Sequence, residues 1–592
     1  MTAIDDLPFE QIWLHDFEFV PGSGERPDVV CLAAHELRSG QTLALWRDEL
    51  GPAPPYRTDR NVLFVSFVAN AECACHLALG WPLPANVLDL NPAFRNLTNG
   101  RPTPEGKGLI GALRYFGLPS IGSKQKEAMQ KRVIAGWPFT PDERRQILDY
   151  CAADVDALRA LLLAMVPKLD LATALYHGEF AAVSALMEHN GVPIDMEMFA
   201  QLADTNTWRA VRDAMVPAID ANYGVYVRNA AGDWAFNMER FAAYLEREGI
   251  AWPLLETGKL NMRRKVFEEM SRGWPQLENL RQLRHARDKM RKVKLAVSRD
   301  GRNRTVLWPF KAKTSRTQPK ASQWIFSPAV WLRSLIKPGP GMAVAYIDYS
   351  AMEFQIAASL SDKHCGAINN MLDMYNSGDP YLAFTKRVGA APRNATKKSH
   401  ADVRDKYKTM LLGTQYGMAT QTLAARLGVP SFEAHQMLNQ HREVFAQYWR
   451  WSDDWVQHAL QTGTMRTVLG WTCAVGITEF NERSIRNWPV QATGAEILRV
   501  ALIMAARHGI KLLAPVHDAV LIEAPIDQIE ADVAKMQDIM RRAARTVLGG
   551  HELRTEASII RHPERYSDKR GVAIWARVLE LLAAQHKPRK TA

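Results

Sequence analysis

The sequence predicts an α/β protein with at least two domains, and three observations lead to this prediction. The chain has 592 residues, which is more than a single hydrophobic core usually supports. Short apolar segments of strand type alternate with long segments of helical periodicity. Hydrophobic residues make up 47% of the composition, which is typical of an ordered globular chain rather than a disordered one.

Residues 1–165 predict the first α/β domain. Residues 11–19 (QIWLHDFEF) and 61–69 (NVLFVSFVA) are apolar and aromatic, which favours strands. Residues 142–165 have helical periodicity and follow Thr140-Pro141, a helix-start signal. Strands followed by long helices indicate a sheet covered by helices.

The sequence pattern of residues 166–592 predicts a helical part followed by a part with both strands and helices. Helical patterns dominate residues 170–297, whereas strands alternate with long helices after Trp308. Residues 342–350 and 512–525 each indicate a buried strand. One helical segment is rich in basic residues, namely Arg281, Arg284, Arg287, Lys289, Arg291, Lys292 and Lys294. These side chains either form a solvated helix face or bind a phosphate backbone, and we expect the second.

The charge and cysteine content narrow the class of protein. A formal charge of +11 with an isoelectric point near 9.3 suits a polyanionic partner, although ordinary solubility charge explains it equally well. The six cysteines are too scattered for a disulfide framework or a four-ligand zinc site, so we expect a reducing compartment. Neither a leader-type N-terminus nor an 18-residue apolar run occurs, so we expect no membrane association.

Two aspartates at the ends of predicted strands suit two-metal phosphoryl transfer. Asp348 lies in AYIDYSAMEF and Asp518 in PVHDAVLIE. Divalent cations about 3.5–4 Å apart activate the attacking oxygen and stabilise the leaving one, and hard cations of this kind prefer carboxylate oxygens. A buried strand fixes its terminal carboxylate while leaving it open to substrate.

A cationic and apolar stripe lies between these aspartates. In ADVRDKYKTMLLGTQYG, steps of four separate Arg404, Lys408, Leu412 and Tyr416, and Gly417 follows. Steps of four place the side chains along one side of a helix. We expect the two cations to bind triphosphate oxygens and the other two side chains to contact bases.

A second acidic group is predicted near the N-terminus. Asp16 and Glu18 share one face of a strand, and Tyr150 and Asp154 share one face of a helix. Such acids bind two metals, while the tyrosine hydroxyl orients the attacking water. The middle acidic position is less regular, and we take Glu72 as its candidate, with Asp89 as a neighbouring structural or substrate-side carboxylate.

Together, these motifs resemble those of known polymerases. Asp-Tyr-Ser-x-x-Glu, Arg-x3-Lys-x7-Tyr-Gly and Val-His-Asp, in this order, resemble motifs A, B and C of family A DNA polymerases, which include bacterial polymerase I. Lys313-Thr314-Ser315-Arg316 and Arg483-x3-Asn487-x3-Gln491 resemble DNA-contacting segments of the same family. The N-terminal acids resemble the DEDD exonucleases with tyrosine in the last motif.

The resemblance implies a fold and a role for each matching residue. The fold would be a ribonuclease H-like exonuclease domain (1–165) and a right-hand polymerase domain (166–592), with a thumb at about 170–310 and palm and fingers at about 311–592. The resemblance implies that Asp348, Asp518 and the Tyr349 carbonyl hold metals in the polymerase site. The residues that would bind the triphosphate are Arg404 and Lys408, with Lys408 a proton donor, and those that would contact the nucleotide are Leu412, Tyr416 and Glu353. The residues that would bind DNA are Arg316, Arg483, Asn487, Gln491, His517 and Gly417, and those of the exonuclease site are Asp16, Glu18, Glu72, Tyr150 and Asp154, with Asp16, Glu18 and Asp154 as metal ligands.

The implied activity is template-directed DNA synthesis from dNTPs on primer-template DNA, with 3′-5′ proofreading. Two Mg²⁺ ions would serve each site, and Mn²⁺ would substitute for them. The layout and the C-terminal YSDKRGVAIWARVLELL resemble enzymes of tailed bacteriophages, which implies a monomer that replicates a phage genome in the bacterial cytoplasm. The alternatives are a single-subunit RNA polymerase-like enzyme and a DNA-binding nuclease with a degenerate polymerase domain.

Three positions depart from the family pattern. Leu412 stands where the family usually has Phe or Tyr, which predicts discrimination against dideoxynucleotides. Ala519 follows Asp518 where Glu is frequent, and Gln355 stands where Arg is common. We expect activity to survive the last two changes, because neither removes a principal metal ligand.

Overall fold

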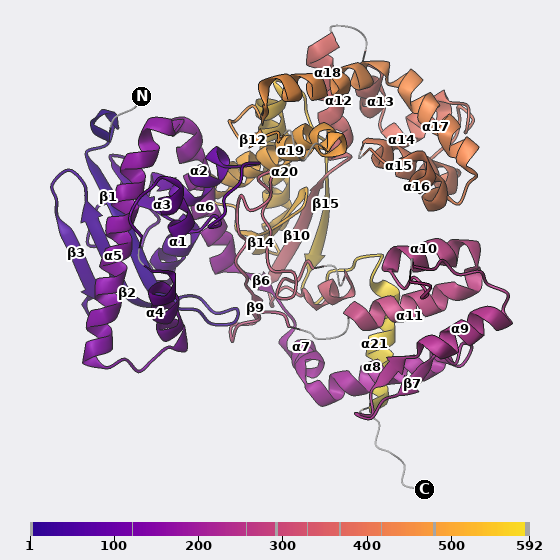
Figure 1. Ribbon diagram of the computed structural model, residues 1–592, viewed down its shortest axis with the longest axis horizontal. Helices are drawn as coiled ribbons and strands as arrows, with labels where there is room; N and C mark the ends of the chain where they lie inside the picture. The colour runs from indigo at the N-terminus through magenta and orange to yellow at the C-terminus, as the bar shows by residue number, and fades with distance from the viewer. Residues whose placement is uncertain are drawn as a thin grey trace.

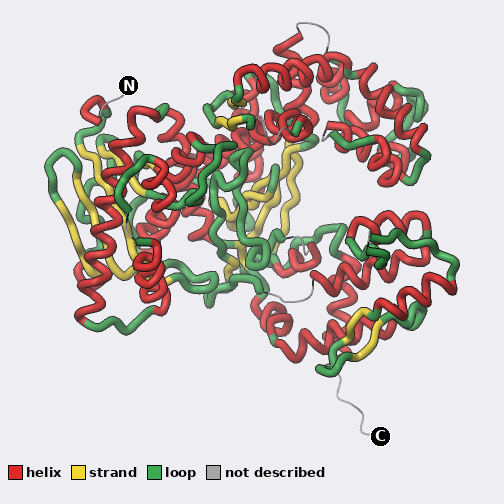
Figure 2. Tube along the Cα trace, in the orientation of Figure 1, coloured by secondary structure: helices red, strands yellow, loops and turns green. Residues whose placement is uncertain are grey.

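The computed structural model describes residues 4–120, 122–255, 257–289, 294–327, 330–365, 369–415, 417–476 and 481–585. Figure 1 shows an N-terminal sheet with its helices, a second sheet near the centre, and two helical arms that extend from the second sheet. Helices predominate outside the two sheets, as the tube in Figure 2 shows. The α/β prediction is confirmed.

The N-terminal sheet has five strands in the order β3-β2-β1-β4-β5. β1 pairs in parallel with β4, and β4 pairs in parallel with β5, whereas the β1–β2 and β2–β3 pairs are antiparallel. The elements of this region are β1 (Gln11–Val20), β2 (Asp28–Glu36), β3 (Thr42–Trp46), β4 (Val62–Ser66), β5 (Val87–Asp89), α1 (Ala69–Ala78), α2 (Leu90–Leu97), α3 (Leu109–Tyr115), α4 (Ser123–Ala135) and α5 (Pro141–Met165).

Local signals explain these boundaries. α5 begins with a capping box, in which the Thr140 hydroxyl accepts from the Glu143 amide and the Glu143 carboxylate accepts from the Thr140 amide. The strand expected over 61–69 is shorter, because the chain turns at Val68 (φ 74°) and α1 begins at Ala69. Phe67 and Val68 therefore precede the helix, and Ala69 is buried at its start.

The central sheet is antiparallel, in the order β13-β14-β10-β15. Its strands are β10 (Met342–Tyr349), β13 (Leu512–Val516), β14 (Ala519–Pro525) and β15 (Thr555–Arg561). The prediction of one strand over 512–525 is wrong, because the segment is a hairpin that turns at His517 (φ 56°) and Asp518. Apolar residues on both sides of a two-residue turn look like one continuous strand in the sequence.

Helical segments flank this sheet. One arm contains α7 (Met196–Ala203), α8 (Thr205–Asp220), α9 (Met238–Arg247), α10 (Arg264–Gly273), α11 (Glu278–Lys289) and the hairpin of β7 (Tyr226–Arg228) with β8 (Trp234–Phe236). The other contains α12 (Met352–Cys365), α13 (Asn370–Asn376), α14 (Pro380–Arg387), α15 (Ala401–Gln415), α16 (Thr420–Leu427), α17 (Ser431–Val444) and α18 (Ala446–Thr462). The remaining elements are β6 (Val192–Pro193), β9 (Arg302–Asn303), β11 (Thr464–Arg466), β12 (Thr472–Ala474), α19 (Glu482–Arg507), α20 (Ile529–Leu548) and α21 (Val572–Gln585).

Helix α6 (Leu171–Asn190) packs on both sheets, since it contacts β5 on one side and β13 on the other. A Cβ at Gly178 would lie 1.8 Å from the Val87 carbonyl oxygen, so the helix backbone lies directly against β5. Near the end of α6, the Glu188 carboxylate accepts from the Leu307 amide at 2.7 Å and from the Asn70 side chain at 3.3 Å. This helix therefore fixes the N-terminal sheet relative to the central one.

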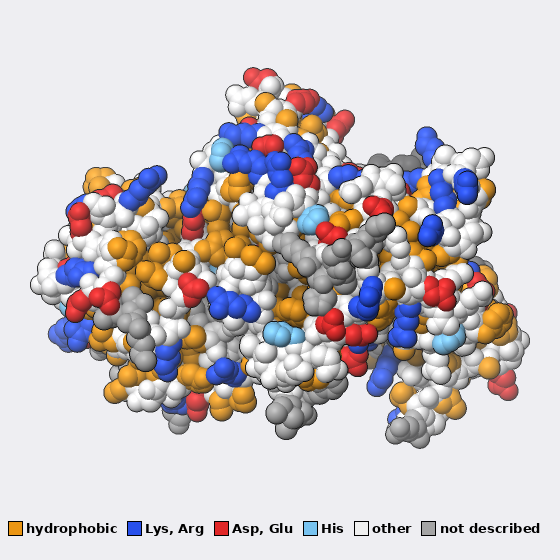
Figure 3. Space-filling model, turned by 90° about the horizontal axis from the view of Figure 1, so that it is seen from above, with side chains coloured by type: hydrophobic (Ala, Val, Ile, Leu, Met, Phe, Trp, Pro, Cys, Tyr) orange, Lys and Arg blue, Asp and Glu red, His pale blue; other side chains and the backbone are white. Residues whose placement is uncertain are grey.

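Helix α19 and the cysteines bear on the expectations about membrane association and redox compartment. α19 is long and apolar enough to span a membrane, but 72% of that window is buried inside the protein, as in a core helix. Cys31, Cys73, Cys75, Cys151 and Cys473 are buried free thiols. Figure 3 shows Lys and Arg side chains spread over one face with acidic ones among them.

Glu188 predicts a pH dependence of stability. Burial raises its pKa from 4.5 to about 8, so the folded chain retains a proton that the unfolded chain releases. This stabilisation is complete below pH 4.5 and is lost as the pH rises through 8. Because Glu188→Gln preserves the hydrogen-bond acceptor without the charge, we expect it to gain stability over wild type between pH 5 and pH 8, by at most about 5 kcal/mol.

Thermal unfolding of both chains at the two pH values measures this difference. The matched control is Glu179→Gln, which removes another carboxylate of α6, one that accepts from Arg507 of α19. A difference between Glu188→Gln and wild type that is the same at both pH values would contradict the prediction.

Candidate active sites

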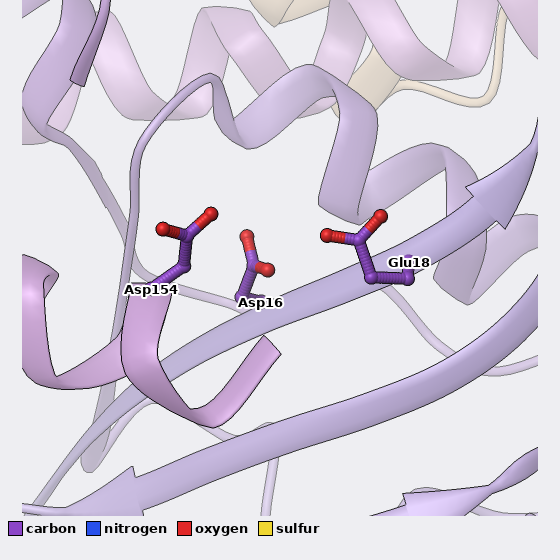
Figure 4. A group of neighbouring side chains, drawn as sticks. All are labelled: Asp16, Glu18 and Asp154. Carbon is purple, nitrogen blue, oxygen red and sulfur yellow. The ribbon is translucent and has the colours of Figure 1, made fainter. Parts of the chain in front are cut away.

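Three carboxylates converge at the N-terminal sheet. Asp16 and Glu18 project from β1 and Asp154 from α5, and one oxygen of each lies within 4.8 Å of the others (Figure 4). The strand and helix spacings predicted this proximity. Oxygen ligands at this separation fit a divalent cation.

The electrostatics of this cluster also favour a cation. Burial and then the charge of Asp154 raise the pKa of Asp16 to about 7, although Lys126 and Cys151 oppose the rise. Burial and then Asp16 raise the pKa of Glu18 well above its usual value. Asp16 and Glu18 therefore ionise together only at a cost, which a bound cation removes.

Tyr150 and Lys126 border the same cluster. Tyr150 lies one turn before Asp154 on α5, and burial raises its pKa. Lys126, from α4, places its Nζ 2.6 Å from Asp154 Oδ2 and 5.6 Å from the centre of the Tyr150 ring. The sequence analysis missed Lys126, because α4 is a polar helix without a pattern that distinguishes this lysine from its neighbours.

Glu72 and Asp89 lie nearby but make different contacts. Glu72 is 4% exposed, and its carboxylate accepts from the Phe17 amide at 2.9 Å. It therefore supports β1 between the two strand acids, and it is not in the metal-type group found among the described residues. Asp89 accepts from the amides of Val68, Ala69 and Asn91, which is a structural role.

The second acidic pair lies in the central sheet. Asp348 is the second-last residue of β10, Asp518 lies in the turn before β14, and the Tyr349 amide donates to the Asp518 carbonyl at 3.3 Å. Burial raises the pKa of Asp348 to about 7, with further contributions from Asp518 and Glu556, while Lys408 opposes the rise. Burial also raises the pKa of Asp518.

Glu556 is another carboxylate that the sequence analysis missed. Asp348 is in register with Ala519 on β14 and with Glu556 on β15. Residues directly opposite in an antiparallel pair share a face, so Glu556 occupies the opposite flank of Asp348 from Ala519. Its position depends on strand pairing between segments far apart in the sequence.

Arg316 links several predicted residues. Its guanidinium lies 3.2 Å from Asp518 Oδ1 and 3.9 Å from Glu353 Oε1, and Gln491 donates to Glu353 at 2.6 Å. The segment before Arg316 is anchored, because the Lys313 carbonyl accepts from the side chains of Asn99, Trp471 and Trp488.

The helix with the cationic stripe is α15. Arg404 is 9% exposed and pairs with Asp379 and Asp405 at 2.7 Å each. Lys408 lies over the Tyr381 ring at 5.5 Å and Leu412 packs against the core of this arm, whereas Tyr416 lies outside the described residues. The structure thus brings Lys408 close to Asp348, while internal carboxylates hold Arg404.

The other predicted DNA contacts lie on α19 and in two turns. Arg483 is exposed and Asn487 partly exposed on α19, and His517 is exposed in its hairpin turn. Gly417 has φ 66°, and a Cβ there would lie 2.9 Å from Arg483 Cγ, so both backbone conformation and packing favour glycine.

The cationic helical segment is only partly described. Arg281 pairs with Glu278, and Arg284 lies over the rings of Phe236 and Phe267. Lys294 is exposed. The side chains of Arg287 and Lys289, and residues 290–293 with Arg291 and Lys292, lie outside the described part of the chain, so the phosphate grip stays a prediction.

Comparison with known proteins identifies the region around Asp348 and Asp518. Residues 323–558 match the model of DNA polymerase family A. This region is therefore similar to DNA polymerase family A, and it covers less than half of the chain. The family A region contains α15, α19 and three of the four strands of the central sheet in full, whereas the Lys313–Arg316 segment and the N-terminal cluster lie outside it.

Relatives of known identity agree with this assignment. The thermostable DNA polymerase I of Thermus aquaticus is 25% identical over 213 residues, which cover 34% of this chain and 25% of that protein. The DNA polymerase of Mycobacterium phage L5 is 22% identical over 405 residues, or 66% of this chain and 62% of that protein. The chain therefore matches less than two thirds of either relative.

A solved structure shares the fold over nearly the whole chain. The POL domain of Pol1 from M. smegmatis, solved in complex with DNA primer-template and dNTP, aligns with a TM-score of 0.67 at 20% identity and covers 92% of this chain and 95% of that one. At this identity the likeness shows the fold, not the activity.

The contacts of Glu72 and Asp154 predict different effects on metal binding. Asp154→Asn weakens a candidate ligand, so we expect Mn²⁺ affinity to fall by at least about tenfold. Glu72→Gln keeps the acceptor for the Phe17 amide and should change the affinity by less than about threefold. Calorimetric titration of the full chain with Mn²⁺, in an Asp518→Asn background that reduces binding at the central sheet, measures both. Equal losses would make Glu72 a direct ligand and contradict this interpretation.

Proposed function

We propose that the chain is a DNA-directed DNA polymerase, a nucleotidyltransferase that extends a primer from dNTPs on a DNA template. The observation that carries this proposal is the convergence of Asp348, Asp518, Arg316 and Lys408 in and beside the family A region. Both aspartates are partly buried near the ends of strands, and the charge of Asp518 raises the pKa of Asp348, which favours divalent cations there.

The residues would divide the work as follows. Asp348, Asp518 and the Tyr349 carbonyl hold the ions, which when bound stabilise charge on the transferred phosphoryl group. Lys408 binds the triphosphate and donates a proton to the departing pyrophosphate. Arg404 reaches the triphosphate only by exchanging its bonds to Asp379 and Asp405 for phosphate.

Other residues near the two aspartates would contact the nucleotide and the DNA. Glu353, held by Gln491, lies beside Arg316 and would exclude a ribose 2′-hydroxyl together with Tyr416. Arg316 and His517 would contact the primer end. Arg483, Asn487, Gln491 and Gly417 would contact DNA near the nucleotide, with Leu412 against the incoming base.

We further propose 3′-5′ exonuclease activity in an N-terminal domain of about residues 1–165, with the polymerase domain over 166–592. The strand order β3-β2-β1-β4-β5 and its directions agree with a ribonuclease H-like sheet. Asp16, Glu18 and Asp154 fit divalent cations, and Tyr150 would orient the attacking water. Glu72 would support β1 rather than bind the metal.

The setting of this activity is also proposed. Mg²⁺ would be the ion at each site, with Mn²⁺ as a substitute, and primer-template DNA and dNTPs the substrates, as in the aligned POL domain complex. The match to a mycobacteriophage polymerase supports replication of a phage genome in the bacterial cytoplasm. We propose a monomer that is not associated with a membrane.

Separate inactivation of the two sites tests the proposal. A labelled primer-template is incubated with Mg²⁺ and dNTPs, or with Mg²⁺ alone. We expect Asp518→Ala to reduce extension at least about 10³-fold while sparing degradation, because a principal metal ligand is lost. The double change Asp16→Ala with Glu18→Ala should do the reverse.

The outcomes separate the alternatives. A wild-type chain that only degrades would identify a nuclease with a degenerate polymerase domain. Extension that is as fast with ribonucleotides as with deoxynucleotides would identify the RNA polymerase-like enzyme. Asp527→Ala, which removes a carboxylate in the turn after β14 outside the proposed site, is the matched control and should leave both activities intact.

Leu412 predicts the sugar preference. A leucine offers neither an aromatic face nor a hydroxyl to the nucleotide, so we expect wild type to discriminate against ddTTP and Leu412→Tyr to use it at least about tenfold better. Chain termination at a fixed ratio of ddTTP to dTTP measures this, with Leu411→Met, a buried neighbour, as the packing control. Ready use of ddTTP by wild type would refute the interpretation.

A further inference from the structure

The contact of Lys126 with the N-terminal acids is unexplained by the roles assigned so far. Its Nζ lies 2.6 Å from Asp154 Oδ2, with side-chain exposures of 14% and 9%. Among the groups that act on both Asp16 and Glu18, Lys126 is the one that lowers their pKa values. It is therefore a cation inside the cluster rather than at its rim.

A purely structural ion pair does not account for this arrangement. One ammonium offsets one carboxylate, and Asp16, Glu18 and Asp154 together carry up to three negative charges. Replacing a buried pair by apolar side chains is often neutral or stabilising, so the pair is a weak source of stability. The cluster retains negative charge for metal ions, and Lys126 then remains as an additional positive group.

The surroundings of Lys126 place it where a phosphodiester would bind. Its Nζ lies 5.6 Å from the centre of the Tyr150 ring, and Tyr150 is the residue proposed to orient the attacking water. Lys131 of the same helix points elsewhere, since it is 74% exposed and pairs with Glu127. A lysine ammonium has three donors, so it contacts a carboxylate and a phosphate oxygen at once.

We propose that Lys126 is a catalytic residue of the exonuclease site, where its ammonium donates a hydrogen bond to a non-bridging oxygen of the scissile phosphate. In the hydrolysis, a water oxygen bonds to phosphorus and loses a proton to solvent. The bond from phosphorus to the 3′-oxygen of the preceding nucleotide breaks, and that oxygen takes the electron pair and a proton from water. Lys126 stabilises the charge that develops on the phosphate during this exchange. The inference rests on the proposed exonuclease function.

The test compares Lys126→Met, Lys126→Arg and the control Lys131→Met in the full chain. Met keeps the methylene packing and removes the charge, whereas Arg keeps the charge. Single-turnover release of the 3′-terminal nucleotide is measured at saturating Mn²⁺, Mn²⁺ affinity is measured by calorimetry, and primer extension reports correct folding. We expect Lys126→Met to slow release about 100-fold at saturating Mn²⁺, without weaker Mn²⁺ binding and with normal extension.

Lys126→Arg should recover at least about tenfold of the loss, because it restores a donor with positive charge, and Lys131→Met should behave as wild type. A Lys126→Met chain that releases the nucleotide at the wild-type rate overturns the proposal. So does a loss that saturating Mn²⁺ removes, since it assigns Lys126 to metal binding alone. A wild type that releases nothing overturns the nuclease function as well, so the two failures are distinguishable.

Discussion

Both candidate sites depend on one constraint, namely that rigid backbone holds carboxylates close together and away from bulk water. Asp16 and Glu18 are fixed by one strand, and Asp348 and Asp518 by two strands of another sheet. Burial and like charge raise the pKa of Asp16 and of Asp348 to about 7. Such groups ionise readily only beside positive charge. The same physical arrangement therefore creates two candidate cation sites on different sheets.

The two sites are held in a fixed relation by contacts between the regions that carry them. α6 lies directly on β5 at Gly178, and Asn99 of the N-terminal region donates to the Lys313 carbonyl, three residues before Arg316. A close-packed interface of this kind resists displacement, so the two regions keep their relative position. A primer end would consequently meet two sites whose separation is set by the fold, which suits alternation between synthesis and removal on one chain.

Sequence patterns were sufficient where function depends on local spacing. The pairs Asp16/Glu18 and Tyr150/Asp154 follow from strand and helix periodicity, and the Thr140 cap located the start of α5. Sequence patterns failed where the position of a residue depends on segments far away in the sequence or on a short turn. Lys126 and Glu556 reach the sites through tertiary packing and strand register, residues 512–525 form a hairpin rather than one strand, and Asp379 holds Arg404. Periodicity contains no information about such partners.

The most direct test of two cooperating sites is the sequence of products made from a primer with a mispaired 3′ end. Wild type is incubated with this primer-template, Mg²⁺ and all four dNTPs, beside the Asp16→Ala, Glu18→Ala double variant. The account predicts that wild-type products carry the correct nucleotide at the former mispair, and that extended products of the variant retain the mispair. Wild-type products that retain the mispair, or the absence of any extension, would contradict it.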